Sequence, residues 1–190
     1  MPLPRFDRLT PSTRTAILAV ARTHFARDGR DGASFNRIIA DAGISKTTAY
    51  HYFDSKDDLF TAVVADTTER TLTALGPWLD VDTTDALWEQ LTAGTNRLVA
   101  HLREHPDDRA VLAIAPQADK SDPWIDQLVG NGLRLGLIDT HPDVGLITMA
   151  TVAIVGTVDG WALNLPDPLA GDPGQALILL LKRLWNTPPS

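Results

Sequence analysis

The sequence predicts an all-α protein with a small N-terminal helix-turn-helix module and a larger helical body. Apolar residues recur at three- and four-residue spacing along most of the chain, and prolines and glycines interrupt this pattern where helices would end. No stretch shows the alternation of apolar and polar residues that a half-buried strand requires. The 190 residues, 44% of them hydrophobic, are enough for a sizeable core.

The N-terminal region begins with two predicted helices. Thr10 is expected to cap the first, with Pro11 in the first helical position, where proline is favoured. Gly29 is expected to end this helix, and Ser34 to cap the next one. In the second helix, Ile38 and its neighbour Ile39 point into the small core.

The segment 33–53 has the layout of a DNA-binding helix-turn-helix. Gly43 permits the sharp turn, and Ser45 is placed to cap the following helix. Ala49 and Phe53 are expected on its inner face. The helix that starts after Ser45 is therefore predicted to lie in a DNA major groove.

The rest of the chain is predicted to be helical. Ser55, followed three residues later by Asp58, resembles a capping box, and the helix it starts should run to Leu75, before Gly76 and Pro77. Further helices are expected near Thr83–Glu104, Asp107–Ala115, Pro123–Leu137, Pro142–Leu165 and Pro173–Trp185.

The charge of the chain is divided unevenly. Residues 1–56 carry nine Lys and Arg against five Asp and Glu, a balance of +4, whereas residues 57–190 carry eight against nineteen, a balance of −11. A basic segment on an acidic body predicts that DNA contact is confined to the N-terminal quarter.

The composition also predicts the cellular setting. The chain has no cysteine, which fits a reducing cytoplasm and removes disulfide and zinc-thiolate sites. Residues 1–14 lack the apolar segment of a secretory signal. The weakly polar stretch Val144–Val158 is shorter than the roughly 20 residues of a membrane span, so it is interpreted as a buried helix. A cytoplasmic protein without membrane contact is expected.

Catalytic motifs are not found in the sequence. The five histidines form no metal-spaced cluster, and neither a Gly-x-Ser-x-Gly nor a His-Glu-x-x-His motif occurs. The glycines of 130–136 have the wrong spacing for a dinucleotide loop and no preceding strand. We therefore expect no enzyme activity, no metal and no cofactor.

The region from about Arg14 to Val64 resembles the tetracycline-repressor-like (TetR) family of transcriptional regulators. The sequence departs from the family pattern at Ile39, Thr47 and Ala49. The residues that carry the resemblance are Ile17, Leu18, Ala21, Phe25, Gly29, Ser34, Ile38, Ala42, Gly43, Ile44, Ser45, Lys46, Thr48, Tyr50, Tyr52, Phe53, Ser55, Lys56 and Leu59.

This resemblance implies a DNA-binding domain over residues 1–54 and a ligand-binding and dimerisation domain over residues 55–190. It implies a ligand-responsive repressor that binds double-stranded, palindromic operator DNA as a homodimer and responds to an unknown small-molecule effector. The alternative is a helix-turn-helix regulator that uses no small molecule or acts through a protein partner.

The resemblance and the chemistry of the side chains together suggest the DNA contacts. Lys46 can donate to guanine or phosphate, the threonine methyls can contact thymine, and the tyrosine hydroxyls suit phosphate oxygens. Ser34 could equally be only a helix cap, and Tyr52 a core residue. The complete predicted set is Ser34, Arg37, Ser45, Lys46, Thr47, Thr48, Tyr50, His51, Tyr52 and Lys56.

A ligand pocket in the body would be apolar with a few polar anchors. Asp159 lies in an apolar stretch and could meet a cationic ligand, an arginine or a dimer axis, or lie at an exposed helix edge. The other candidates are Trp88, His101, Trp124, Asn131, Met149 and Trp161.

The last two predicted helices, over about residues 144–185, are the candidates for dimerisation. The run 176–181 is apolar on every face, so it needs cover from its own body and from a partner.

Overall fold

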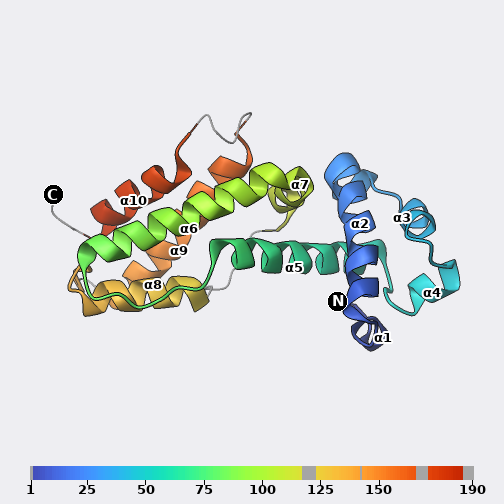
Figure 1. Cartoon of the computed structure of the whole chain (residues 1–190), viewed down its shortest axis with the longest axis horizontal. Coiled ribbons are helices and arrows are strands. Elements are labelled where there is room, and N and C mark those ends of the chain that lie inside the picture. The colour runs from blue at the N-terminus through green and yellow to red at the C-terminus, as the bar shows by residue number, and fades with distance from the viewer. Residues whose placement is uncertain (1, 117–122, 142, 166–170, 186–190) are drawn as a thin grey trace. The chain divides into compact units, whose positions relative to one another are not determined.

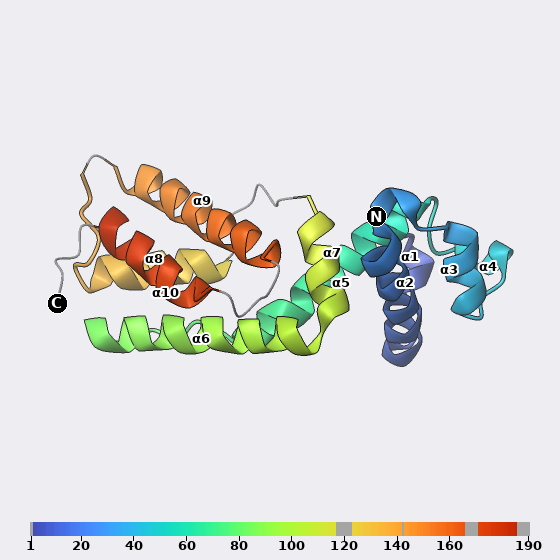
Figure 2. The same ribbon diagram turned by 90° about the horizontal axis from the view of Figure 1, so that it is seen from above.

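The computed structural model describes residues 2–116, 123–141, 143–165 and 171–185, and these residues are helical, without strands. They form two compact units, residues 1–71 with 102–115 and residues 72–101 with 116–190. Figures 1 and 2 show the helices of each unit. The helices are α1 (Pro4–Asp7), α2 (Pro11–Gly32), α3 (Phe35–Asp41), α4 (Lys46–Tyr50), α5 (Lys56–Leu75), α6 (Thr84–Glu104), α7 (Pro106–Ile114), α8 (Pro123–Arg134), α9 (Val144–Leu163) and α10 (Pro173–Leu184).

The predicted helix boundaries of the N-terminal region are largely confirmed. The Thr10 side chain accepts a hydrogen bond from the Thr13 amide at the start of α2. Gly29 leaves helical geometry with φ of 71°, as expected of a helix terminator, but one further turn continues to Gly32. Helix α1 was not predicted, because its four residues are too few to show a periodic pattern.

The first unit has a continuous apolar core. Ile17, Ala21 and Phe25 of α2 pack with Phe53 and with the first turns of α5. The core also includes Val111 of α7, which is fully buried. Helix α7 therefore belongs to this unit although it lies far along the chain.

Buried charges hold α7 against α2 and α5. The Asp108 carboxylate is 1% exposed and lies 3.1 Å from Arg22 Nε and 3.0 Å from Arg70 Nε. Arg22 also pairs with Asp66. The division into units thus differs from the expected boundary after residue 54, because this ion-pair cluster brings together residues that are distant in sequence.

The second unit has its own core, enclosed by α6, α8, α9 and α10. Leu87 and Leu91 of α6, Leu128 of α8 and Leu181 of α10 are fully buried. Trp185, at the end of α10, packs against Trp88, with ring centroids 5.6 Å apart.

Helix α9 differs from its predicted environment. It is 20 residues long and, within the described residues, is long and apolar enough to cross a membrane by length and composition. Only Ile147, Thr151 and Val158 are buried, so the interpretation of this segment as a buried helix is wrong. Three of its large apolar side chains are exposed instead, Leu146, Met149 and Trp161, at 53%, 71% and 45%. Leu179 and Leu180 of α10, which packs against α9, are exposed as well.

Candidate nucleic-acid interface

Helix α4 presents one face to the core and the other to solvent. Gly43 has φ of 69°, the conformation that the preceding turn requires, and the Ser45 hydroxyl accepts a hydrogen bond from the Thr48 amide at 3.1 Å. Ala49 and Phe53 are fully buried on the inner face. The exposed side chains of this helix and its cap are Ser45, Lys46, Thr47, Tyr50 and His51.

The side chains on this face differ in how many contacts they already make within the protein. The hydroxyls of Ser45 and Thr48 share a hydrogen bond of 2.7 Å, so Thr48 presents mainly its methyl group. Tyr50 packs on Phe35 of α3, which leaves the tyrosine 47% exposed. Lys46 and Thr47 are the exposed polar side chains of the first turn, the end of a recognition helix that meets base edges.

Helix α3 contributes two of the predicted residues. Ser34 occupies the capping position but makes no side-chain hydrogen bond to the first turn of the helix. Arg37 is exposed on the same helix. Both side chains are therefore available for an external partner.

Two predicted phosphate contacts lie in environments that the sequence did not indicate. Tyr52 is half-buried, and its ring lies edge-on to that of Phe6, with centroids 6.0 Å apart. Lys56 is half-buried at the start of α5, and its ammonium donates to the Asp31 carbonyl oxygen at 2.7 Å. Lys56 therefore already has one hydrogen-bond partner within the protein, and its ammonium has further protons to donate to a phosphate.

The cations of the first unit fall into two classes. Arg22, Arg27 and Arg30 each lie beside a carboxylate of the same unit. In the part of the chain that the structure describes, no ion pair engages Arg5, Arg8, Arg14, Arg37 or Lys46. The positive charge expected from the sequence is therefore partly neutralised internally, and the remainder is available to a polyanion.

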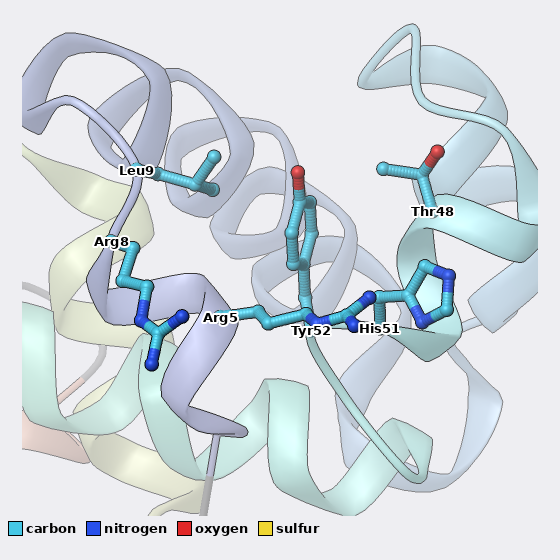
Figure 3. Close-up of a pocket in the computed structure, with 6 residues that line it drawn as sticks. All are labelled: Arg5, Arg8, Leu9, Thr48, His51 and Tyr52. Carbon is cyan, nitrogen blue, oxygen red and sulfur yellow. The ribbon is translucent and has the colours of Figure 1, made fainter.

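An open cleft of about 370 Å³ lies beside α4. It is lined by Arg5, Arg8, Leu9, Thr48, His51 and Tyr52, which Figure 3 shows around the upright Tyr52 ring. The sequence analysis missed Arg5 and Arg8. Their three-residue spacing around Phe6 was the available signal, since it places two arginines on one side of a helical turn.

Known proteins resemble this chain in sequence over its N-terminal part and in fold over most of its length. A family model described as bacterial regulatory proteins, tetR family, matches residues 17–63. The HTH-type transcriptional regulator UidR of Escherichia coli (strain K12) is 42% identical over 60 residues, which are 32% of this chain and 31% of UidR. The match to the tetR family therefore covers α3, α4 and the residues that flank them.

The resemblance of this chain to solved structures extends over most of its length. A TetR-like transcriptional regulator from Rhodococcus sp. RHA1 has a TM-score of 0.57 and 26% identity, covering 93% of this chain and 96% of that one. A TetR-family regulator from Pectobacterium atrosepticum has a TM-score of 0.60 and 20% identity, covering 94% and 96%. The sequence match to the curated relatives spans only about a third of their length.

Three residues predicted to line a ligand pocket belong to the core of the second unit. The Asn131 side chain is 1% exposed, and its oxygen accepts from Trp78 Nε1 and the Val81 amide while its nitrogen donates to the Val81 carbonyl. Trp124 packs edge-on to Trp78, and Trp88 packs on Trp185. The expectation of Asn131 as a ligand anchor is corrected, because its hydrogen-bonding groups already serve the fold.

The other predicted pocket residues lie on α6 and α9. Met149 and Trp161 are exposed on α9, and His101 is half-buried on α6. Asp159 is exposed too, and no cation of the described residues pairs with it. Desolvation by the protein atoms around the carboxyl nevertheless raises the pKa of Asp159 to about 6. Three of the seven predicted pocket residues thus lie in the core, three lie on the exposed face of α9 and His101 lies on α6, so the seven do not gather around one described cavity.

Proposed function

We propose that this protein is a transcriptional regulator that binds double-stranded DNA through α4. The observation that carries the proposal is the exposed face of α4, with Lys46 and Thr47 in the first turn, on a domain that matches the TetR family model. The unpaired cations beside it supply the charge that DNA phosphates attract. The protein has a regulatory and not a catalytic role, and it acts on DNA in the cytoplasm.

Different parts of this surface would position the protein and read the sequence. Lys46 reaches guanine O6 and N7 or a phosphate, and the Thr47 methyl or hydroxyl contacts a base edge. Tyr50, Ser34 and Arg37 bind phosphates, contacts that fix the register of the helix without specifying sequence.

The test compares the binding of duplex DNA from upstream of the protein's own gene by the wild type and by Thr47→Ala. A base contact is worth about 1–3 kcal/mol of discrimination, so we expect the variant to change the preferred base at one position of each half-site. Thr15→Ala, at an exposed position of α2, is the matched control. An identical base-preference profile for the wild type and Thr47→Ala would remove Thr47 from direct readout, and failure of the wild type to prefer any sequence would overturn the proposed function.

We further propose that the protein is a homodimer that binds a palindromic operator. Support comes from the exposed apolar face of α9 and α10, carried by Leu146, Met149 and Leu180 among others. A methyl group added at Gly156 would meet nothing within 4 Å, so a partner helix could approach closely there. A second copy of the chain, related by two-fold symmetry, would bury the apolar faces of both copies against each other.

Ligand-responsive repression is the mode of action we propose for this dimer. An effector changes DNA affinity only if it binds one conformation of the dimer better than the other. The alternative, a regulator without a small-molecule effector or with a protein partner, gains support from Asn131, Trp88 and Trp124, because all three serve the core of the second unit. Release of bound DNA by a small molecule, measured by mobility shift, favours the first; release only by another protein favours the second.

A further inference from the structure

We propose that Arg5 and Arg8 of α1 form a clamp for one DNA backbone phosphate, at the cleft beside the recognition helix. The inference rests on the proposed DNA binding and adds a contact from a segment that precedes the helix-turn-helix. It assigns the cleft to a phosphodiester and not to a free metabolite, because the same cleft is lined by Thr48 of α4, the helix that faces the bases.

Helix α1 is anchored directly to the end of the recognition helix. Phe6 is 4% exposed, and its ring centroid lies 4.7 Å from that of Phe53 and 6.0 Å from that of Tyr52. The Leu3 amide donates to the Tyr52 carbonyl oxygen at 2.8 Å. The backbone that carries the arginines on either side of Phe6 is therefore held in place before any ligand arrives, which lowers the entropic cost of binding.

The chemistry of the cleft suits a phosphate. Two guanidinium groups offer planar sets of N–H donors that match phosphate oxygens. Arg5 and Arg8 are exposed, and among the described residues Asp7, the acidic residue of α1, forms no ion pair with either of them. Figure 3 shows Arg8 on the α1 side of the cleft and Thr48 and His51 on the α4 side, with the Arg5 side chain extending past Tyr52 toward His51. A neutral His51 ring can donate one further hydrogen bond.

The position of the clamp predicts what it contributes. A phosphate held between α1 and the C-terminal end of α4 fixes how deeply α4 enters the groove, without reading a base. Loss of the clamp should therefore weaken binding to all sequences by a similar factor and leave the preferred sequence unchanged.

The experiment measures duplex affinity by fluorescence anisotropy over a range of salt concentrations for the full-length wild type and for Arg5→Ala, Arg8→Ala and the double variant. Each lost phosphate contact lowers the log–log salt slope by about 0.9, so one shared phosphate predicts a decrease of about 0.9 for the double variant. We expect roughly tenfold weaker binding at low salt, on cognate and non-cognate duplexes alike. Arg5→Lys retains the positive charge but loses the planar set of guanidinium N–H donors. Its salt slope should therefore lie between the slopes of Arg5→Ala and the wild type.

Arg103→Ala is the matched control for each single variant, since it removes one positive charge from an exposed arginine outside the cleft. The clamp is overturned if the double variant keeps the wild-type affinity and slope, or matches Arg103→Ala. The clamp is also overturned if the variants change the base preference, because the arginines would then contact base edges and not a phosphate. Failure of the wild type to bind DNA would overturn the proposed function. If the wild type binds DNA and the double variant binds equally well, only the clamp is overturned.

Discussion

At the scale of single residues, Asn131 shows how a polar side chain can serve the fold alone. Its amide joins α8 to the segment of Trp78 and Val81 by three hydrogen bonds, at 3.2, 2.9 and 3.0 Å. Buried polar groups without a partner are costly, so the side chain cannot be removed without leaving several groups unsatisfied.

We expect Asn131→Ala to lower the free energy of unfolding by about 2–4 kcal/mol, measured by urea denaturation. Gln90→Ala removes a single hydrogen bond at the protein surface, from Gln90 to the Leu79 carbonyl, and should cost less than about 1 kcal/mol. Equal effects of the two substitutions would show that the Asn131 bonds contribute little.

Asp159 predicts a pH dependence of stability. Its carboxyl has a pKa raised to about 6 by desolvation, against an ordinary value of 3.8. A raised pKa means that the folded state binds the proton more tightly, so this contribution to stability is complete below about pH 3.8 and is lost as the pH rises through about 6.

We therefore expect Asp159→Asn to gain stability relative to the wild type as the pH rises from 4 to 7, measured as the difference in urea midpoints. The difference between the two urea midpoints reports on Asp159 alone, because the other carboxylates are present in both proteins. A difference that stays constant across this range would mean that Asp159 titrates normally.

At the scale of elements, the cluster of Arg22, Arg70, Asp66 and Asp108 assigns α7 to the first unit. Asp108 is buried between two arginines, and removing it leaves Arg22, only 9% exposed, without one of its two carboxylate partners. Breaking a buried ion pair on one side costs more than the pair itself contributes.

Asp108→Ala should destabilise the protein by about 3 kcal/mol, detected by thermal or urea unfolding. Its neighbour Asp107 is half-buried and accepts one hydrogen bond from Thr23 at the protein surface, so Asp107→Ala should cost below about 1 kcal/mol. Were Asp108→Ala as stable as Asp107→Ala, the cluster would not hold α7 in place.

Elements also show what a sequence can and cannot predict. The caps at Thr10 and Ser45 and the turn at Gly43 were predictable, because each depends on residues only a few positions apart. Helix α1 and the place of α7 were not, since Phe6 is anchored on Phe53 and Asp108 on Arg22, contacts between distant segments. For the same reason the candidate site was predicted on α3 and α4, but without Arg5 and Arg8.

At the scale of the whole molecule, the exposed apolar face of α9 and α10 predicts self-association. Water-exposed Leu146, Met149 and Trp161 on a helix this apolar are unfavourable in an isolated chain and favourable when a second copy covers them. The sequence indicated these helices, but the exposed stripe is visible only in the structure.

Met149→Lys should convert a dimer of about twice 20.6 kDa into a monomer in sedimentation velocity at micromolar concentration, because it places a charge in the apolar contact. Ala93→Lys adds the same charge at an exposed position of α6 and should remain dimeric. A monomeric wild type would exclude the dimer, and binding of the wild type to lipid vesicles would indicate that α9 meets a membrane instead.

The most direct test of the account is selection of duplexes from a random DNA pool by the full-length protein. Two copies of α4 related by two-fold symmetry predict enrichment of a palindrome with two half-sites, bound by two chains, with the preferred bases altered by Thr47→Ala. A pool that stays random after selection, or a preferred sequence unaffected by substitution in α4, would contradict it.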